Sequence, residues 1–290
     1  MIGVGGCGMS GLAGVLLQRG ALLSGCDLRS SEAVMRLASL GAQISTEQRA
    51  ADLPDGVSVI ISSAAVSHDH PQLVEARLRG LRMMKYAEAL GWLMSQSVGI
   101  AISGTHGKST TTAWTAFILK RAGFDPTFIV GGHVDQLGGG SGAGAGRHFI
   151  AEACEYDRSF LNLNPMCGAI LNIEEDHLDY YENIAAIEEA FGEFAARVSD
   201  SGLLVVNGRD ERCVRVAEQA TARVETFGDS PDCTWQYTDL YATDGHYSFN
   251  VWRAGQKLGR ATLGPAGLHN VWNALAACAV ADHCGVEWDD

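Results

Sequence analysis

A glycine-rich turn that carries a lysine constrains the fold of this chain more than any other feature. It lies between an apolar run and a helical pattern, and its motif G-x-x-G-K-S is formed by Gly104, Gly107, Lys108 and Ser109. In such strand–turn–helix units the backbone N–H groups surround phosphate oxygens, the lysine neutralises phosphate charge and the hydroxyl binds Mg²⁺. The motif is shorter than a full Walker A motif, because Ile102 stands where that motif has a further glycine. The turn therefore predicts a phosphate-binding loop.

A second glycine-rich turn opens the chain. Gly3, Gly5 and Gly8 match G-x-G-x-x-G after a short apolar run and before a helical pattern, and Asp27 ends the next apolar run. Such a turn lets backbone N–H groups and a helix N-terminus approach a diphosphate, and the acidic residue can accept a hydrogen bond from a ribose hydroxyl. The pattern alone fits a dinucleotide, a sugar nucleotide or a strand-to-helix turn without a ligand.

Strand and helix patterns alternate around both turns, which indicates parallel sheets covered by helices. Before a connecting helix at 86–97, we expect strands at 1–4, 21–26 and 57–62 and helices at 10–19, 31–40 and 71–80. After it, we expect strands at 98–103, 128–130, 148–153, 168–172 and 202–207, shorter strands within 233–263 and a helix at 270–284. The glycine-rich run at 138–146 is expected to form a flexible loop.

This pattern predicts an α/β protein of two domains. An N-terminal Rossmann-like parallel-sheet domain is expected to cover residues 1–95, and a P-loop-type α/β domain to cover residues 96–290. A chain of 290 residues suits two compact cores better than one. Apolar side chains recur every three or four positions from Ile184 to Val198, which predicts a helix with one buried face.

Composition narrows the class of protein. The chain has 21 Lys and Arg against 34 Asp and Glu, a formal net charge of −13, and the cations do not cluster, so we expect no nucleic-acid partner. The apolar runs fall short of the roughly 20 residues of a membrane span and no leader opens the chain, so we expect a cytoplasmic protein with no membrane partner. The eight cysteines contain no C-x-x-C pair and are expected to be reduced thiols.

Polar residues that follow the later strands are candidate ligands. Glu152 ends an apolar strand, and adjacent strand ends would place its carboxylate beside Ser109, where both could bind a cation. We interpret Glu155 as part of a solvated acidic loop. Asp176 and His177 follow another strand, and the residues alone favour an ordinary loop histidine over a metal ligand.

Two asparagines mark the start of the last helix. The amides of Asn270 and Asn273 could read the edge of an adenine, or they could cap the helix. The sequence pattern leaves both interpretations open.

These blocks, in this order, resemble the Mur ligases of peptidoglycan synthesis over nearly the whole chain. The blocks are "GVGGCGMSGLA", "SGCDLRSS", "VIISSAAV", "GTHGKSTTT", "DPTFIVGG", "AEACEYDRSFLNLNP", "NIEEDHLDYY" and "HNVWNALAA". The "GMSG" and "DPTF" blocks and the histidine of "GTHGK" are most similar to the branch that adds L-alanine. Other branches carry a modified lysine on the helix after the "DH" pair, whereas residues 179–200 contain no lysine.

The resemblance implies a ligase that uses ATP and Mg²⁺ to join L-alanine to UDP-N-acetylmuramate through an acyl phosphate. Lys108, Glu152 and His177 would be its catalytic residues, and Ser109, Glu152 and His177 its metal ligands. The implied ATP site consists of Gly104, Thr105, His106, Gly107, Lys108, Ser109, Thr110, Asn270 and Asn273. The implied UDP-sugar site consists of Gly3, Gly5, Gly6, Gly8, Met9, Ser10, Asp27 and Ser63.

The chain departs from the family pattern in two respects. Cys154 and Tyr156 stand where the family usually has an acid and a serine, in the block "EADESD". The chain also ends soon after the last helix, without the family's C-terminal, amino-acid-binding domain. We therefore expect these 290 residues to bind nucleotides without sustaining ligation alone, because domain closure excludes water from a reactive acyl phosphate. Steady L-alanine-dependent ADP release would contradict that expectation.

Three alternatives stay open. A recycling ligase that joins a preformed tripeptide to UDP-N-acetylmuramate shares the same motifs. A nicotinamide-dependent dehydrogenase would use the first glycine turn and Asp27, but it leaves the lysine-bearing turn without a role. An inactive nucleotide-binding fragment is suggested by Cys154, Tyr156 and the missing domain.

Overall fold

The computed structural model describes residues 1–288, which divide into two compact units. The first unit comprises Met1–Leu93 and Thr127–Ala145, and the second comprises Met94–Pro126 and the residues from Gly146 onward. The division near residue 94 lies close to the expected boundary at 95. The segment 127–145 differs from the expected division, because it packs with the first unit although it lies within the second in sequence.

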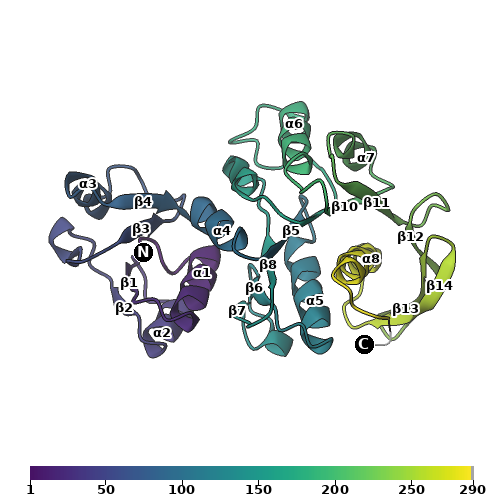
Figure 1. Cartoon of the computed structure of the whole chain (residues 1–290), viewed down its shortest axis with the longest axis horizontal. Coiled ribbons are helices and arrows are strands. Elements are labelled where there is room, and N and C mark those ends of the chain that lie inside the picture. The colour runs from purple at the N-terminus through teal and green to yellow at the C-terminus, as the bar shows by residue number, and fades with distance from the viewer. Residues whose placement is uncertain (289–290) are drawn as a thin grey trace. The chain divides into compact units, whose positions relative to one another are not determined.

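The first unit alternates short strands with helices (Figure 1). Its main run consists of α1 (Cys7–Gln18), β1 (Ser24–Cys26), α2 (Glu32–Ser39), β2 (Gln43–Ser45), a 3₁₀ turn at Ala50–Asp52, β3 (Val59–Ser62), α3 (Pro71–Leu78), β4 (Arg82–Lys85) and α4 (Tyr86–Met94), the last residue of which belongs to the second unit. The returning segment adds β6 (Thr127–Ile129), a 3₁₀ turn at Asp135–Leu137 and β7 (Ser141–Gly142).

Parallel pairing organises the first unit around its N-terminal residues. Strand β1 pairs with β2 and strand β3 pairs with β4, both in parallel. Ile2 forms parallel bridges to Cys26 and to Ser62, so it links the two pairs. The expected strand at 1–4 is therefore this single bridging residue, and β2 and β4 were not expected. Both missed strands are short and half exposed, so their sequences lack a strong apolar pattern.

The glycine-rich run at 138–146 is more ordered than expected. Ser141 and Gly142 form β7, which pairs antiparallel with β6. The side-chain hydroxyl of Ser141 lies about 3.1 Å from the position that a Cβ on Gly14 of helix α1 would occupy. The prediction of a flexible loop was wrong here, because glycines allow the backbone itself to pack closely where larger side chains would prevent it.

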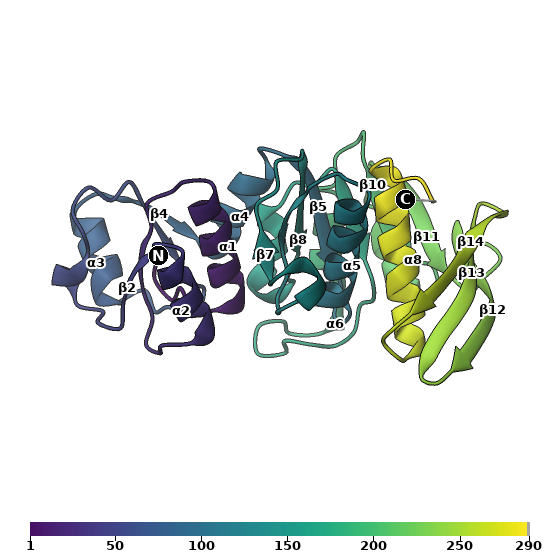
Figure 2. The ribbon, with the colours of Figure 1, turned by 90° about the horizontal axis from the view of Figure 1, so that it is seen from below.

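The second unit contains the longer sheet (Figures 1 and 2). Its helices are α5 (Lys108–Arg121), α6 (Ile184–Ala195), α7 (Glu211–Ala217) and α8 (Leu268–His283), with a 3₁₀ segment at Tyr156–Asn162. Its strands are β5 (Val98–Ser103), β8 (His148–Glu152), β9 (Cys167–Ile170), β10 (Leu203–Asn207), β11 (Arg223–Gly228), β12 (Trp235–Thr243), β13 (His246–Arg253) and β14 (Gln256–Leu263).

Within this unit the strand order is β14-β13-β12-β11-β10-β9-β5-β8. The strands from β8 to β12 pair in parallel, whereas β12, β13 and β14 form an antiparallel meander. Helices α5 and α8 pack on one face of the parallel strands and α6 and α7 on the other (Figure 1). Because helices cover both faces of the parallel strands, every residue of β9 and β10 is buried.

This topology places the candidate site. In β5, β8 and β9 the chain runs in the same direction, so the segments that follow these strands meet at one edge of the sheet. Those segments are residues 104–107, 153–157 and 171–177. They carry the lysine-bearing turn, the acidic block and the "DH" pair, respectively.

The fold class predicted from the sequence is confirmed, since both units are α/β and contain parallel strands. The expected helix with one buried face is α6, in which Ile187, Phe191 and Phe194 are buried. The cysteines of the chain are free thiols, and most of them are buried. No helix within residues 1–288 is long and apolar enough to cross a membrane.

Candidate nucleotide-binding site

The lysine-bearing turn is held by the segment that follows β9. The backbone N–H of Thr105 donates to the carbonyl of Asn172 at 3.0 Å. The Asn172 side chain accepts from the His106 N–H at 2.7 Å and donates to the His106 carbonyl at 3.0 Å. The Glu174 N–H donates to the Thr105 hydroxyl at 2.9 Å. These hydrogen bonds hold the backbone of the turn against the segment that follows β9.

Gly107 completes the turn and begins helix α5. Its φ of 86° lies in the left-handed region, and a Cβ at this position would lie 2.5 Å from Oδ1 of Asn273. Only glycine fits both constraints without strain. The first N–H groups of α5 have no partners within the helix, so the turn and the helix N-terminus together favour an anion such as a phosphate.

Lys108, the first residue of α5, is fully engaged by neighbouring groups. Its ammonium donates to the carbonyls of Gly104 at 2.6 Å and Thr105 at 3.1 Å. It also contacts both carboxylate oxygens of Glu155 at 3.0 Å. The lysine side chain is 16% exposed and that of Glu155 is 3% exposed, so this is an almost buried ion pair. The ammonium is thereby aimed into the loop.

The interpretation of Glu155 as a solvated acidic residue was wrong. Its carboxylate is buried against Lys108, and its carbonyl accepts hydrogen bonds from the Tyr181 hydroxyl and from the Arg158 N–H. Burial raises the pKa of Tyr181, which keeps the phenol in its hydrogen-donating form. The sequence shows several acids in a short loop, but only the fold shows which of them turns inward.

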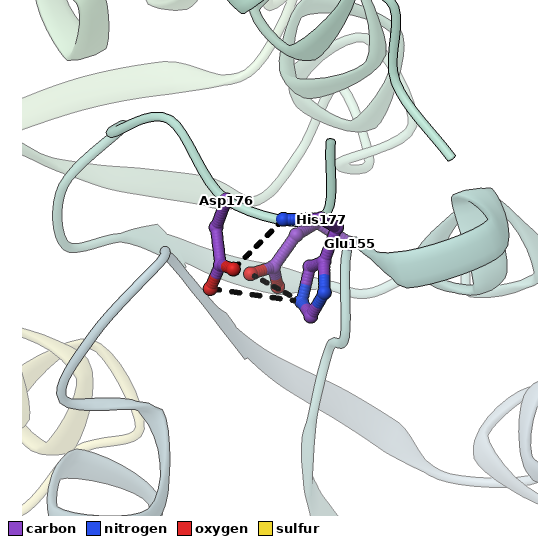
Figure 3. A group of neighbouring side chains, drawn as sticks. All are labelled: Glu155, Asp176 and His177. Atoms are coloured by element: carbon purple, nitrogen blue, oxygen red, sulfur yellow. Dashed lines mark hydrogen bonds and ion pairs between the residues drawn. The ribbon is translucent and has the colours of Figure 1, made fainter. Parts of the chain in front are cut away.

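Glu155, Asp176 and His177 form one cluster, shown in Figure 3. One potential ligand atom from each residue lies within 4.8 Å of the other two. The His177 Nε2 lies 3.8 Å from Glu155 Oε1 and 3.8 Å from Asp176 Oδ2, and the His177 N–H donates to Asp176 Oδ1 at 2.7 Å. Two carboxylates and an imidazole are suitable donors for a divalent cation, so the residues present fit such an ion.

His177 adopts a backbone conformation that is uncommon for a residue with a side chain. Its φ is 54°, in the left-handed region, and its carbonyl accepts from the N–H groups of Tyr180 and Tyr181. Unusual backbone of this kind persists only where the surrounding contacts stabilise it, and it is common at functional sites. The imidazole points toward Glu155 and is half-buried (Figure 3). The expectation that His177 is an ordinary loop residue does not describe this environment.

The other predicted cation ligands lie near this cluster in the fold. Ser109 is exposed in the first turn of α5, and Glu152 is half-buried at the end of β8. Glu152 is in register with Ile102 of β5, two residues before the lysine-bearing turn begins. The carboxylate that pairs with Lys108 is that of Glu155, three residues further along. Binding of a cation by Ser109 and Glu152 stays a prediction.

A cavity of about 1040 Å³ adjoins the lysine-bearing turn. Its lining includes His106, Gly107, Asn207, Arg209, His269, Trp272 and Asn273. The guanidinium of Arg209 lies 5.6 Å from the centre of the Trp272 ring, and Arg212 and Arg215 pair with Glu188 at 3.2 Å and 3.1 Å. Aromatic, cationic and amide groups in one cavity are suited to a nucleoside attached to a phosphate.

The two asparagines of α8 are buried beside this cavity. The Asn270 amide donates to the carbonyl of Ala266 at 2.6 Å, and the Asn273 amide contacts Asn270 Oδ1 at 3.4 Å. Asn273 lines the cavity. The N-cap of α8 is Gly267, so neither asparagine is the N-cap residue that one interpretation proposed. Recognition of an adenine by these amides stays a prediction.

The glycine turn of the first unit joins the bridging residue Ile2 to helix α1. Gly3 has a φ of 76°, and a Cβ there would lie 3.1 Å from Cβ of Ser63. Gly6 is the N-cap of α1 and offers no side-chain cap, so the helix N-terminus is available to an anion.

The other residues of the predicted UDP-sugar site also have partners in the first unit. The Asp27 carboxylate accepts from the Gly5 N–H at 2.8 Å and from the Arg29 N–H at 3.2 Å. The Ser10 hydroxyl donates to the Cys7 carbonyl at 3.0 Å, and Met9 is buried. A Cβ on Gly8 would lie 2.7 Å from Cζ of Tyr86, and the Ser63 N–H donates to the Ile2 carbonyl. Binding of a sugar nucleotide at this turn stays a prediction.

The sequence models of two protein domains match this chain. The Mur ligase middle domain matches residues 102–281, and the catalytic domain of the Mur ligase family matches residues 1–98. The first match covers more than half of the chain and contains the lysine-bearing turn, the acidic block and the "DH" pair. The chain belongs to the Mur ligase family.

Curated Mur ligases align with nearly all of this chain. UDP-N-acetylmuramate–L-alanine ligase of Aquifex aeolicus is 40% identical over 288 residues, which are 99% of this chain and 63% of the relative. The enzyme of the same name from Clostridium acetobutylicum is 42% identical over 282 residues, which are 97% of this chain and 61% of the relative. The chain therefore spans somewhat less than two thirds of the length of these relatives.

Two solved Mur ligase structures share the fold. One is UDP-N-acetylmuramate:L-alanyl-gamma-D-glutamyl-meso-diaminopimelate ligase from Neisseria meningitides, with a TM-score of 0.89, 29% identity, and coverage of 99% of this chain and 93% of that chain. The other is UDP-N-acetylmuramate-alanine ligase from Thermotoga maritima, with a TM-score of 0.85, 28% identity, and coverage of 98% and 64%.

The two departures from the usual Mur ligase pattern, Cys154 and Tyr156, flank Glu155 of the cluster in the sequence. The Tyr156 ring packs edge-on against His177 with 4.9 Å between ring centres, and its hydroxyl donates to Asp179 at 3.2 Å. That hydrogen bond raises the pKa of Tyr156. Cys154 is exposed. Tyr156 thus supports the histidine by contact, while the structure gives no reason for the cysteine.

The sequence did not predict the roles that three residues of this site have in the structure. Glu155 pairs with Lys108, Asp176 contributes to the cluster, and Asn172 holds the turn through both ends of its amide. Each follows a parallel strand at the same sheet edge as the lysine-bearing turn. That position was a usable signal, although the sequence could not show the direction of each side chain.

Proposed function

We propose that this protein is an ATP-dependent ligase that joins L-alanine to UDP-N-acetylmuramate. The observation that carries the proposal is the position of Lys108, at the start of a helix, beside a cavity and facing the Glu155–Asp176–His177 cluster. A cation, a helix N-terminus and a set of cation ligands are the groups that phosphoryl transfer requires. We infer the substrates from the names of the curated relatives.

In the proposed reaction the terminal phosphate of ATP is transferred to the lactyl carboxylate of UDP-N-acetylmuramate. Lys108 would neutralise the charge that develops on the transferring phosphoryl group, and the N–H groups of residues 107–110 would hold its oxygens. The amine of L-alanine would then displace phosphate from the acyl phosphate. The cavity bounded by His106, Trp272 and Asn273 would receive the nucleoside.

Mg²⁺ is part of this proposal. The fit rests on the donor set of Glu155, Asp176 and His177, and the family resemblance adds Ser109 and Glu152. A bound Mg²⁺ would offset the charge of adjacent phosphates. The residues themselves would hold the ion beside the lysine-bearing turn.

The glycine turn of the first unit is the proposed site for the UDP-sugar. Backbone N–H groups between Gly3 and Ser10 and the N-terminus of α1 would face the diphosphate. Asp27 would have to give up a backbone hydrogen bond, or share one, in order to accept from the ribose. Since ATP and UDP-sugars are intracellular metabolites, we expect the protein to act in the cytoplasm.

A second candidate is a ligase that joins a preformed tripeptide to UDP-N-acetylmuramate. Its support is the similarity to the Neisseria structure, whose name includes a tripeptide. The curated relatives at 40% and 42% identity carry the name of the L-alanine enzyme instead. We therefore place L-alanine first.

Calorimetry of Mg²⁺-ATP with the wild-type chain and Lys108→Ala tests the nucleotide site. We expect the variant to bind at least about tenfold more weakly, equivalent to about 1.4 kcal/mol, because it lacks the cation that faces the phosphates. Lys120→Ala is the matched control, since Lys120 lies in the last turn of the same helix. A change of less than about twofold for Lys108→Ala would remove the phosphate-loop assignment.

The acceptor is tested by measuring ADP formation with the full gene product. L-alanine and the tripeptide are supplied side by side, each with UDP-N-acetylmuramate. We expect faster turnover with L-alanine. Faster turnover with the tripeptide would instead select the recycling ligase.

A further inference from the structure

Lys108 has no capacity left for a new hydrogen bond in this structure. An ammonium group has three protons, and the carbonyls of Gly104 and Thr105 and the carboxylate of Glu155 use all three. A phosphate oxygen can therefore contact Lys108 only if one of these partners yields. The two carbonyls belong to the turn itself, whereas Glu155 belongs to a different segment.

The Glu155 backbone is anchored by hydrogen bonds, and its side chain is buried. Its side chain is 3% exposed, and its carbonyl is bonded to the buried Tyr181 and to the Arg158 N–H. A second carboxylate, that of Asp176, belongs to the same cluster. Once a phosphate displaces it from Lys108, the Glu155 carboxylate is left buried without its cation, close to another carboxylate and to the entering phosphate. Such an arrangement is strongly unfavourable unless a new positive charge enters with the phosphate.

We propose that Glu155 makes nucleotide binding depend on a divalent cation, because it neutralises Lys108 when no nucleotide is bound and needs a replacement cation when phosphate binds to that lysine. This inference rests on the proposed function, which places ATP at the lysine-bearing turn. The coupling is reciprocal, so the cation also binds more tightly when the nucleotide is present. Glu155 positions Lys108 before the nucleotide binds, and it is one of the proposed ligands of the cation that replaces Lys108 as its partner afterwards.

The experiment measures the Kd of ATP by calorimetry in Mg²⁺ and in EDTA, for wild type and for Glu155→Gln. Glutamine has the same shape, can accept from Lys108 through its amide oxygen and carries no charge. We expect the ratio of the Kd in EDTA to the Kd in Mg²⁺ to be about tenfold smaller in Glu155→Gln than in wild type. The reason is that cation-free ATP can then contact Lys108 without leaving a buried carboxylate unpaired.

Glu182→Gln is the matched control, because it also removes one negative charge but lies exposed in the segment after the "DH" pair. Its ratio should stay within about twofold of wild type. Glu155→Ala is a second variant that removes the charge, and thermal unfolding establishes which of the two is folded. AMP is a further probe on wild type, since it lacks the phosphates that reach Lys108 and its Kd should depend far less on Mg²⁺ than that of ATP.

The outcomes separate this inference from the proposed function. Failure of wild type to bind ATP in Mg²⁺ would remove the proposed function and this inference with it. A second outcome would overturn only the role of Glu155. In it, a folded Glu155 variant binds Mg²⁺-ATP, and its ratio of the Kd in EDTA to the Kd in Mg²⁺ equals that of wild type. Equal Mg²⁺ dependence for AMP and ATP in wild type would also overturn that role, because the coupling would then not arise at Lys108.

Discussion

The two glycine-rich turns have similar sequences but are stabilised in different ways. In the first unit a carboxylate from the end of the next strand, Asp27, accepts the backbone N–H groups of Gly5 and Arg29. In the second unit an amide, Asn172, both donates to and accepts from His106, and a buried ion pair fixes Lys108. The Asp27 carboxylate thus anchors the first turn, while the second turn is held from two neighbouring segments.

This difference indicates what each turn is prepared to bind. A carboxylate already occupies an N–H group of the first turn, so a ligand there must meet a negative charge at its edge. The second turn presents a cation, and the carboxylate that pairs with this cation belongs to a cluster where a metal could lie. A highly charged triphosphate with its metal suits the second turn, and a diphosphate joined to a hydroxyl-bearing ribose suits the first.

The largest effect in this comparison is expected from breaking the ion pair of the second unit. Lys108→Ala leaves the Glu155 carboxylate buried without a partner, and we expect the free energy of unfolding to fall by about 3 kcal/mol. The double variant Lys108→Met/Glu155→Gln should recover most of this loss, because it removes both charges. Urea denaturation monitored by circular dichroism measures both. A double variant as unstable as the single one would mean that packing, rather than the stranded charge, causes the loss.

A smaller difference is expected between the glycines of the two turns. Gly107→Ala combines a φ of 86° with a Cβ only 2.5 Å from Asn273 Oδ1, so we expect a loss of about 2 kcal/mol in unfolding free energy. Gly3→Ala, at a φ of 76° and 3.1 Å from Ser63, should lose about 1 kcal/mol. Denaturant titration of both variants gives the comparison. A larger loss for Gly3→Ala would show that the first turn is the more tightly constrained one.

Exchanging the two anchoring side chains sharpens the comparison further. Asn172→Asp loses the donor to the His106 carbonyl and adds a negative charge beside the lysine-bearing turn, so we expect Mg²⁺-ATP to bind about tenfold more weakly. Asp27→Asn should leave Mg²⁺-ATP binding unchanged, because Asp27 belongs to the first unit. Calorimetry with ATP measures both variants. An unaltered affinity in Asn172→Asp would show that the amide does not determine the shape of the loop.

The last comparison concerns acid stability, which we expect to differ between the units. His148, at the start of β8, is 1% exposed and neither ring nitrogen has a hydrogen-bond partner, and burial, aided by Arg147, lowers its pKa from the ordinary value of 6.5. Because the unfolded chain then binds more protons, His148 should reduce stability as the pH falls below about 6.5, by at most about 1.4 kcal/mol per pH unit. Urea midpoints across this pH range measure the slope.

His148→Phe should make stability depend less on pH, because phenylalanine does not titrate. It also keeps an aromatic ring beside Phe124, since the ring centres of Phe124 and His148 lie 5.3 Å apart. In the first unit His70 is half-buried, its pKa is also lowered by burial, and its ring accepts the Gln72 N–H at the start of α3. His70→Asn preserves a capping side chain and should change the slope less. An unchanged slope in His148→Phe would contradict the assignment of the acid sensitivity to this residue.

Regular spacing made most of the fold predictable. The strand at Val98–Ser103 and the helices α2 and α6 follow strong apolar patterns and lie where the sequence indicated. The short strands β2 and β4 and the packing of residues 127–145 with the first unit had no such pattern. Their positions depend on partners that are distant in the sequence.

The sequence by itself determined that two glycine turns each join an apolar segment to a helix, and that a lysine, acids and a histidine follow parallel strands. Local geometry dictates these features, since glycine spacing and apolar periodicity act over a few residues. Only the tertiary structure decided that Glu155 faces Lys108, that His177 turns toward it and that Asn172 holds the loop. The physical reason is that a side chain's partner depends on strand order and burial, which no short segment contains.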